Sequence, residues 1–476
     1  MQKTNFWFVV MMIVSTVTNA TIIDVPGDYS TIQAGLNIAV QGDTVLVQPG
    51  TYVENIIWPG ANGIKLFSAG DSSNTIIDGS YFNGVIYISG IGNTDTTTVI
   101  RGFRITHGYT SGLGGGIYCS RSNLSLENCT ITANSAYDEG GGISCYFTNV
   151  TIENCTITNN SVSGQGGGIA NYDSNLTIED CIISANLSSD YGGGIYCNVS
   201  NASVQNCTIE GNSAVHGGGI ICMSGNVIIE SCIIRGNSTT MGDGGAIWCW
   251  YSSLTAVEVL LDSNFASGYG GGVYCCDNTS PSFEHCTVSR NMAGIEGDGI
   301  YTTNNSWPTI SRCNIFQNGM GIYNSDSTQI LNCPNNWWGD PSGPYHPTLN
   351  PYGLGDSTNA YVNPMPFLTE PDSLAPPAAV SEHHFQPPTA FRLFPNYPNP
   401  FNATTTIVFE LPVISKVTLD VYNILGQVVA TIIDDKMLSS GCHDVTFSDT
   451  NLSSGVYFYQ LTADRNTAIG KMVLLK

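Results

Sequence analysis

One phrase that recurs between Gly114 and Cys333 constrains the fold of this chain more than any other feature. Each copy has a glycine cluster, an apolar residue that a cysteine often follows, and an alternating run that often ends in Asn-Cys-Thr-Ile. The clusters include Gly114, Gly140, Gly166, Gly192, Gly217, Gly244, Gly270, Gly297 and Gly319, so most steps are 25 to 27 residues long. A fixed period of this size predicts a solenoid in which each repeat forms one coil.

The residues within one period indicate that each coil is made of strands and turns. Short alternating runs rich in Ile, Val, Thr and Tyr are separated by Gly, Asn and Ser, without a helical spacing. Ile117 and Cys119 share one parity, and Cys129 and Ile131 share another, so each pair should face inward from its own strand. We therefore predict an all-β fold, a right-handed parallel β-helix whose coils stack about 4.8 Å apart.

A column of asparagines supports this interpretation. Its members each follow an apolar residue by three positions: Asn134, Asn160, Asn186, Asn212, Asn237, Asn264, Asn291 and Asn318. Such a column can form a structural amide ladder, which we favour, or a polar binding strip. The phrase GGGI followed by IxxN resembles the GGAI and FxxN repeats of polymorphic outer-membrane proteins and other pectate-lyase-like β-helices. The resemblance implies the fold and not the chemistry.

Sixteen cysteines would ordinarily suggest disulfides in an exported protein. Most fall in two columns: Cys119, Cys145, Cys197, Cys222, Cys249 and Cys275 in the first, and Cys129, Cys155, Cys181, Cys207, Cys232, Cys286, Cys313 and Cys333 in the second. Bridges within coils would require paired losses, but Asn171 replaces a first-column cysteine while Cys181 remains. We favour buried, reduced thiols, and bridges between adjacent coils stay open.

The N-terminal residues 1–20 have the features of a secretory signal peptide. Lys3 supplies the positive start, Phe6 to Val14 an apolar core, and Thr18-Asn19-Ala20 a small-residue cleavage site. No segment of the mature chain has the length of a transmembrane helix. The formal charge of −23, with only 14 Lys and Arg, argues against nucleic acid and anionic lipid as partners.

Residues 21–372 should form the β-helix, closed at both ends. Ser30-Thr31-Ile32-Gln33 has the spacing of a capping box, and Ile32, Leu36 and Ala39 share a helical face, which predicts an N-terminal capping helix. Asn335-Asn336-Trp337-Trp338-Gly339 resembles the terminal segment of secreted β-helix proteins. Its tryptophans are expected to seal the last coil, although stacking on sugar is the alternative.

The C-terminal region has a different character. Residues 373–390 contain Ala-Pro-Pro and Gln-Pro-Pro-Thr and are predicted to be a linker. Residues 391–476 contain alternating strands with turn signals, which predict a small β-sandwich. From Phe394-Pro395-Asn396-Tyr397-Pro398-Asn399-Pro400 to the terminal Lys471-Met472-Val473-Leu474-Leu475-Lys476, this region resembles the sorting domain of type IX secretion cargo. The resemblance implies that the type IX machinery exports the protein, which is then secreted or attached to the outer cell surface.

The catalytic signatures of β-helix enzymes are largely missing from the sequence. The Arg-x-Pro-x-x-Arg segment of pectate lyases is absent, and the polygalacturonase pattern is matched only by Asn93-Thr94-Asp95. Neither Gly-x-Ser-x-Gly nor His-Glu-x-x-His occurs. The sequence therefore favours a protein that is not an enzyme, with a polysaccharide lyase or glycoside hydrolase as the alternative.

One outward column carries the candidate site. The residue between the inward Ile and the inward Cys should face solvent, and in successive coils it is Tyr196, Ile221, Trp248, Tyr274, Tyr301 and Tyr323. Trp248, Tyr274, Tyr301 and Tyr323 would form a carbohydrate-binding stripe, because sugar rings present apolar C–H faces to aromatic platforms. The alternative is that the rings simply stack on one another.

Asp243, Glu296 and Asp298 lie near the glycines and are weak candidates for catalysis. They could also bind sugar hydroxyls or Ca²⁺, but no metal site is expected and no cofactor is required. The alternative is that these three carboxylates are solvated turn residues without a role in binding or catalysis. We predict a secreted or surface protein that binds a polysaccharide or surface glycan or serves as an interaction scaffold. An adhesin or structural spine without a small-molecule site remains a further alternative.

Overall fold

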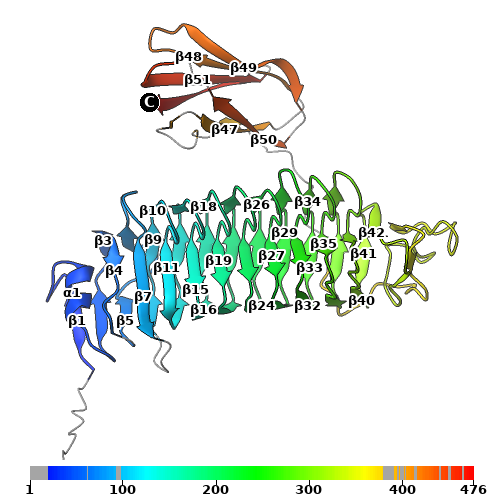
Figure 1. Cartoon of the computed structure of the whole chain (residues 1–476), viewed down its shortest axis with the longest axis horizontal. Coiled ribbons are helices and arrows are strands. Elements are labelled where there is room, and N and C mark those ends of the chain that lie inside the picture. The colour runs from blue at the N-terminus through cyan, green and yellow to red at the C-terminus, as the bar shows by residue number, and fades with distance from the viewer. Residues whose placement is uncertain are drawn as a thin grey trace, which may run out of the picture. The chain divides into compact units, whose positions relative to one another are not determined.

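The computed structural model of the chain divides into two compact units, residues 1–378 and 379–476, drawn in Figure 1. The structure describes residues 20–61, 63–92, 98–378, 391–393, 396, 401–402, 404–411, 415–438, 441–448, 452–463 and 466–475. The predicted signal peptide, apart from residue 20, lies outside the described residues, as do residues 379–390 of the predicted linker.

The first unit is a parallel β-solenoid, which confirms the predicted fold class. Each full coil passes in turn through a third, first, second and fourth sheet, and equivalent strands pair in parallel. The first sheet contains β1 (Ile22–Val25), β2 (Thr44–Val47), β5 (Lys65–Ser68), β8 (Thr98–Arg101), β12 (Leu124–Glu127), β16 (Asn149–Glu153), β20 (Asn175–Glu179), β24 (Asn201–Gln205), β28 (Asn226–Glu230), β32 (Ser253–Val257), β36 (Ser282–Glu284) and β40 (Thr309–Ser311). The second contains β3 (Gly50–Val53), β6 (Thr75–Asp78), β9 (Arg104–Thr106), β13 (Thr130–Thr132), β17 (Thr156–Thr158), β21 (Ile182–Ser184), β25 (Thr208–Glu210), β29 (Ile233–Arg235), β33 (Leu260–Asp262), β37 (Thr287–Ser289) and β41 (Asn314–Phe316).

The third sheet faces the viewer in Figure 1 and carries the candidate site. It contains β4 (Ile56–Ile57), β7 (Ile86–Gly92), β11 (Ile117–Ser122), β15 (Ile143–Tyr146), β19 (Ile169–Tyr172), β23 (Ile195–Asn198), β27 (Ile220–Met223), β31 (Ile247–Trp250), β35 (Val273–Cys276), β39 (Ile300–Thr302), β42 (Met320–Asn324) and β44 (Ser357–Thr358). The fourth sheet contains β10 (Tyr109–Thr110), β14 (Ser135–Ala136), β18 (Ser161–Val162), β22 (Leu187–Ser188), β26 (Ser213–Ala214), β30 (Ser238–Thr239), β34 (Phe265–Ala266) and β38 (Met292–Ala293). Two further short strands, β43 (Leu331–Asn332) and β45 (Val362–Asn363), pair beyond the last full coil.

The repeat places equivalent residues directly above one another. Cys119 pairs with Cys145 in the third sheet, and Ile131 pairs with Ile157 in the second sheet. Residues of the inward parity fill one continuous core of Ile, Leu, Val and Cys side chains. The predicted inward positions are therefore confirmed, because alternate residues of a strand point to opposite faces.

Each glycine cluster makes the turn into the third sheet. Gly114 has a φ of 67°, in the left-handed region that favours glycine. A Cβ on Gly115 would lie 2.5 Å from the carbonyl oxygen of Gly141 in the next coil. The clusters therefore reflect both a backbone conformation and the close approach of adjacent coils.

The asparagine column is a buried structural ladder. Asn160 Nδ2 donates to Asn186 Oδ1 at 3.0 Å and to the carbonyl oxygen of Ile131 at 3.0 Å. Its Oδ1 accepts from the backbone N–H of Asn134 at 3.1 Å. Because Asn160 is only 1% exposed, this column supports the turns and offers no binding strip.

The fifteen cysteines from Cys119 to Cys333 are free and buried. Burial raises the pKa of Cys197 to about 12, and burial likewise raises the pKa of Cys119 to about 12. A thiol in such surroundings stays protonated and behaves as a small apolar side chain.

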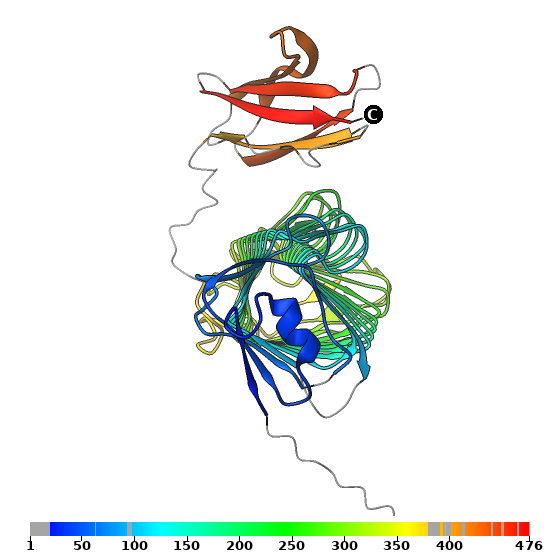
Figure 2. The same ribbon diagram turned by 90° about the vertical axis from the view of Figure 1, so that its left-hand side faces the viewer.

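Both ends of the solenoid are covered. The helix α1 (Ile32–Ile38) lies across the N-terminal opening in Figure 2, and Ile32 and Leu36 are fully buried. Thr31 Oγ1 accepts from the N–H of Ala34 at 3.1 Å, and the Glu54 carboxylate accepts from the N–H groups of Ile32 and Gln33 at 2.9 Å each. These bonds satisfy donors at the start of the helix.

At the other end, Trp338 belongs to the core and is fully buried, and Trp337 is 9% exposed. Rings this inaccessible cannot stack on a sugar, so the NNWWG segment seals the solenoid.

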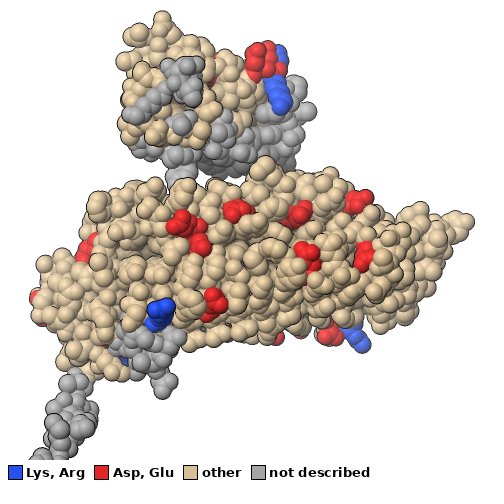
Figure 3. All heavy atoms as spheres, viewed as in Figure 1, with Lys and Arg blue, Asp and Glu red and all other residues tan. Residues whose placement is uncertain are grey.

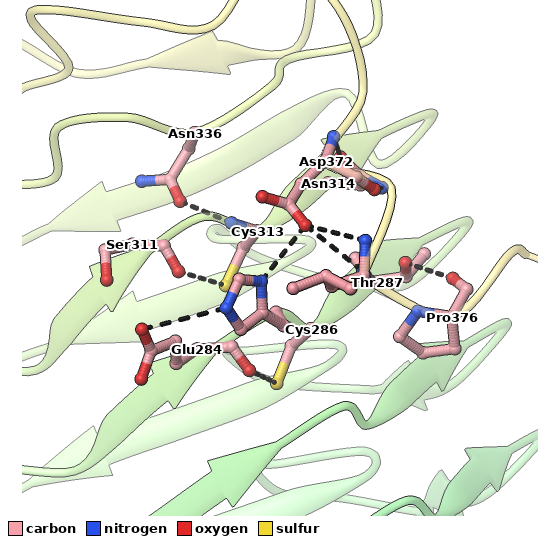
Figure 4. A network of polar contacts seen from close by, with 12 residues as sticks. Glu284, Cys286, Thr287, Ser311, Cys313, Asn314, Asn336, Asp372 and Pro376 are labelled. Atoms are coloured by element: carbon pink, nitrogen blue, oxygen red, sulfur yellow. Dashed lines mark hydrogen bonds and ion pairs between the residues drawn. The ribbon is translucent and has the colours of Figure 1, made fainter.

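Figure 4 shows how the chain then returns along the second sheet: Asp372 Oδ1 lies 3.0 Å from His285 Nδ1, and the backbone N–H of Asp372 donates to Asn314 Oδ1 at 2.8 Å. The Thr287 hydroxyl donates to the carbonyl oxygen of Pro376. The first residues of the predicted linker thus pack on the solenoid.

The second unit has two antiparallel sheets around its own core, in agreement with the predicted β-sandwich. One sheet has the order β46 (Arg392–Leu393), β47 (Thr404–Leu411), β50 (Gly441–Ser448). The other has the order β49 (Val428–Leu438), β48 (Ser415–Tyr422), β51 (Gly455–Ala463), β52 (Asn466–Leu474). Phe409, Leu419 and Tyr459 are fully buried between them.

Candidate functional site

A band of aromatic rings follows the outer face of the third sheet. We call Tyr87, Tyr118, Tyr146, Tyr172, Tyr196, Trp248, Tyr274, Tyr301 and Tyr323 the aromatic band. In its N-terminal half the ring centroids lie 5.0 Å (Tyr87–Tyr118), 6.3 Å (Tyr118–Tyr146), 4.8 Å (Tyr146–Tyr172) and 5.2 Å (Tyr172–Tyr196) apart. In its C-terminal half they lie 6.2 Å (Trp248–Tyr274), 5.5 Å (Tyr274–Tyr301) and 5.4 Å (Tyr301–Tyr323) apart.

The band is longer than the predicted stripe because the rings change position within the strands. Tyr118 and Tyr196 are the second residues of their strands, whereas Tyr146 and Tyr172 are the fourth residues of β15 and β19. The fourth position also faces outward, so the rings remain neighbours across the shift. A search of the second-position column misses Tyr146 and Tyr172, although both outward columns were visible in the sequence.

A second column runs beside the band, at the turn between the fourth and third sheets. We call these residues the flanking column: Glu139, Gln165, Tyr191, His216, Asp243, Tyr269 and Glu296. The Tyr191 and His216 rings lie 5.5 and 4.9 Å from Trp248, and the Tyr269 ring lies 4.5 Å from Tyr301. The column therefore covers part of the band and bridges the gap at Ile221.

The predicted solvent exposure of the stripe is wrong for several of its residues. Tyr196 is 4% exposed, Ile221 0%, and Trp248 and Tyr301 are 8% exposed each. Trp248 Nε1 donates to Cys276 Sγ at 3.2 Å within a small second core outside the coil. These side chains do point away from the main core, but the flanking column folds over them. Tyr274 and Tyr323 remain half-buried.

The three predicted acids have different surroundings. Asp243 Oδ1 accepts from the N–H of Tyr269 at 2.9 Å. Asp298 accepts from the N–H groups of Ala293 at 2.8 Å and Met320 at 3.0 Å, so its carboxylate ties turns together. Glu296 is exposed. The structure gives no sign that any of the three reacts, and their catalytic role stays a prediction.

Asp243 and Glu296 occupy the same coil position two coils apart, which places their backbones roughly 10 Å apart at about 4.8 Å a coil. They do not form a compact pair that shares a proton. Among the residues that the structure describes, no cluster of three or more His, Cys, Asp or Glu could hold a metal ion.

Glu139 was not among the site residues predicted from the sequence, although it occupies the same place before a glycine cluster as Asp243 and Glu296. Its carboxylate accepts a hydrogen bond from the Tyr146 hydroxyl. Burial raises the pKa of Glu139, the neighbouring Tyr172 hydroxyl opposes this rise, and the nearby charge of Asp138 adds to it. A carboxyl group that retains its proton above the usual pH can donate a hydrogen bond or a proton.

A depression of about 410 Å³ opens beside Glu139. Its lining consists of Leu113, Tyr137, Asp138, Glu139, Ser163, Gly164 and Gln165. The Tyr172 hydroxyl donates to Gln165 Oε1 at 3.1 Å, and Gln165 Nε2 donates to Asp190 Oδ2 at 3.0 Å. The depression therefore adjoins the N-terminal half of the aromatic band, where Tyr87 is 49% exposed.

Acidic groups dominate the surroundings of the site. On the face drawn in Figure 3, Asp and Glu recur along the solenoid, whereas Lys and Arg are sparse. Arg121 is the single Lys or Arg in the described strands of the third sheet, and its guanidinium lies 5.8 Å from the Phe147 ring. The arrangement can hold a ligand through ring faces and hydrogen-bonding side chains.

Comparison with known families identifies both units. The model of the right handed beta helix region matches residues 13–165, 136–264 and 256–335. The model of the secretion system C-terminal sorting domain matches residues 396–475. No curated protein shows a significant match to the chain.

Two solved structures are similar to the chain. The mannuronan C-5 epimerase A-module of Azotobacter vinelandii is 14% identical, with a TM-score of 0.34 over 71% of this chain and 96% of the other. The pectin methylesterase from carrot is 12% identical, with a TM-score of 0.25 over 75% of this chain and 90% of the other. No helix in the described parts of the chain has the length and apolar character needed to cross a membrane.

Proposed function

Since the chain belongs to the right-handed β-helix family, we propose that it binds glycan on the outer face of its third sheet. The sorting domain directs the protein to the type IX secretion machinery, so the protein is secreted or attached to the cell surface. An exported protein in that position meets polysaccharides directly. The proposed site is the N-terminal half of the aromatic band together with Glu139 and Gln165.

One observation carries this proposal: accessible rings continue from coil to coil beside fixed polar groups. Tyr118, Tyr146 and Tyr172 are half-buried, so their faces and edges remain partly open. Phe147 is 48% exposed on the turn next to Tyr146. Aromatic rings can cover the apolar C–H face of a pyranose, while carboxylate and amide groups bind its hydroxyls. A row of rings along the axis suits a linear polymer.

The predicted stripe takes a secondary role in this proposal. Tyr274 and Tyr323 are half-buried and extend the ring surface toward the C-terminal coils. Trp248 and Tyr301 lie beneath the flanking column, where they support the surface and have little area to offer a ligand.

Binding can be measured with the full chain and soluble polysaccharides by titration calorimetry. Replacing both Tyr118 and Tyr146 by Ala should lower affinity at least tenfold. Tyr352→Ala is the matched control, because Tyr352 is 88% exposed in the C-terminal cap. Equal affinity of the double variant and the control would contradict the proposed site, and the absence of binding by the wild type would favour an interaction scaffold.

A polysaccharide hydrolase or lyase is the second candidate function. Glu139 favours it, because a carboxyl group with a raised pKa at the edge of a depression is suited to proton transfer. Release of new reducing ends from a bound glycan, lost in Glu139→Gln, would support this candidate. Binding without any release would leave the protein a glycan-binding protein.

A further inference from the structure

We propose that the depression beside Glu139 determines the class of glycan, and that it accepts an uncharged pyranose and rejects a uronate. The inference rests on the proposed glycan-binding function and adds the chemistry of the ligand.

The shape of the depression is built into the repeat. Its lining residues occupy equivalent turn positions in three successive coils, and Leu113, Glu139 and Gln165 pair in parallel there. A Cβ at Gly164 would lie 1.9 Å from the carbonyl oxygen of Asp138, so the backbone of one coil rests directly on the next. The volume of about 410 Å³ falls within the range of small-ligand sites, about 300–1,000 Å³.

The polar groups at the inner edge are held in position. Tyr146 donates to Glu139, and Tyr172 donates to Gln165 at 3.1 Å, so each ring fixes a neighbouring side chain of the flanking column. The two rings stack at 4.8 Å with an angle of 5° between their planes. A sugar hydroxyl in the depression would meet a carboxyl group and an amide whose orientations are already set.

The charge of the lining opposes an anionic sugar. Asp138 and Glu139 line the depression, and the Asp190 carboxylate accepts a hydrogen bond from Gln165 Nε2 at 3.0 Å. Among the described residues that line the depression there is no Lys, Arg or His. A uronate would bring its carboxylate into a site with two acidic groups and no cation, where like charges repel. An uncharged pyranose would find hydrogen-bond acceptors at no such cost.

An exposed ring also belongs to the lining. Tyr137 is 63% exposed and lines the depression. Its ring could cover a C–H face that the inner polar groups leave free.

The test compares uncharged polymers with uronate polymers on the full chain. Laminarin, xyloglucan and galactomannan serve as uncharged probes, and polygalacturonate and alginate as uronate probes, each with a chelator and again with Ca²⁺. We expect at least one uncharged polymer to bind at least tenfold more tightly than polygalacturonate and alginate, both with the chelator and with Ca²⁺. Uronate binding of equal or greater strength, with or without Ca²⁺, would overturn the inference but leave the proposed function standing. Tightest binding of the cationic polymer chitosan would also overturn it.

Two variants test the electrostatic reason. Replacing Asp138 by Asn and Glu139 by Gln preserves side-chain size and removes both negative charges of the lining, so uronate affinity should rise at least tenfold. Glu258→Gln, which removes an exposed carboxylate from the turn between β32 and β33, outside the depression, should change neither this affinity nor that for the uncharged polymer. An unchanged uronate affinity in a folded double variant would refute the inference. If no glycan binds the wild type, the proposed function itself fails, and the inference with it.

Discussion

The Tyr146 hydroxyl donates a hydrogen bond to the Glu139 carboxylate, and this contact links the aromatic band to the flanking column. Tyr146 belongs to strand β15 of the third sheet, whereas Glu139 lies in the turn that precedes the same strand. One coil thus supplies both a ring for a sugar face and a carboxyl group for its hydroxyls. The depression begins where these two columns meet.

The stability of the protein should depend on pH through Glu139. Its folded pKa is raised above the ordinary value of 4.5, mainly by burial. The folded state therefore binds this proton more tightly than the unfolded chain does. The resulting stabilisation is complete below the unfolded pKa and is lost as pH rises through the folded pKa.

Glu139→Gln should abolish this component. Thermal denaturation at several pH values should show the variant gaining stability relative to the wild type as pH rises above 4.5. Glu296→Gln serves as a control at the same coil position, where the side chain is exposed. A difference between wild type and Glu139→Gln that does not change with pH would contradict the assignment.

Trp248→Ala should destabilise the solenoid by about 3–5 kcal/mol, the range for removing a large buried aromatic side chain. Trp248 is 8% exposed and contacts the rings of Tyr191 and His216. Chemical denaturation would measure the loss, with Tyr352→Ala as an exposed control. Equal stability of the two variants would mean that the flanking column does not cover Trp248 in solution.

Replacing an asparagine of the buried ladder should destabilise the solenoid far more than replacing an exposed asparagine. Asn186 Nδ2 donates to Asn212 Oδ1 at 3.0 Å and to the carbonyl oxygen of Ile157 at 2.9 Å. Asn186→Ala leaves buried partners unsatisfied, which costs about 1–3 kcal/mol for each group. Asn175→Ala removes a similar contact, to Asn149 Oδ1 at 2.8 Å, between exposed residues at the starts of β20 and β16, and should cost much less. Denaturant unfolding of the two variants tests the difference, and equal losses would contradict it.

The cysteines of the solenoid should be unreactive in the folded protein. A thiol reagent should label few of the cysteines from Cys119 to Cys333 under native conditions and all fifteen of them after denaturation, because these thiols are buried and free. Cys207→Ala should cost about 1–3 kcal/mol by leaving a cavity. Mass analysis without reduction that revealed bridges between coils would refute this prediction.

The sorting domain should be needed for export and not for folding of the solenoid. The two units are compact and have separate cores, so deletion of residues 391–476 should leave the β-helix intact inside the cell. Fractionation of a host with type IX secretion would measure the location. Undiminished export of the truncated chain would contradict the role of the domain.

The sequence alone was sufficient to predict the solenoid, because its period and parity are local properties. Ile117 and Cys119 had to face one side of a strand, and the stacking of equal coils followed from the repeat length. The inward columns and the separate C-terminal sandwich were predicted for this reason.

Only the tertiary structure determines how far the outward side chains are exposed to solvent. Parity specifies on which side of a sheet Trp248 lies, but it does not show whether another segment covers that side. Tyr191 and His216 come from different coils and reach Trp248 only after the coils have stacked. The pairing of Tyr146 with Glu139 and the depression beside them likewise depend on how the turns fold over the sheet, which the spacing of residues along the chain does not determine.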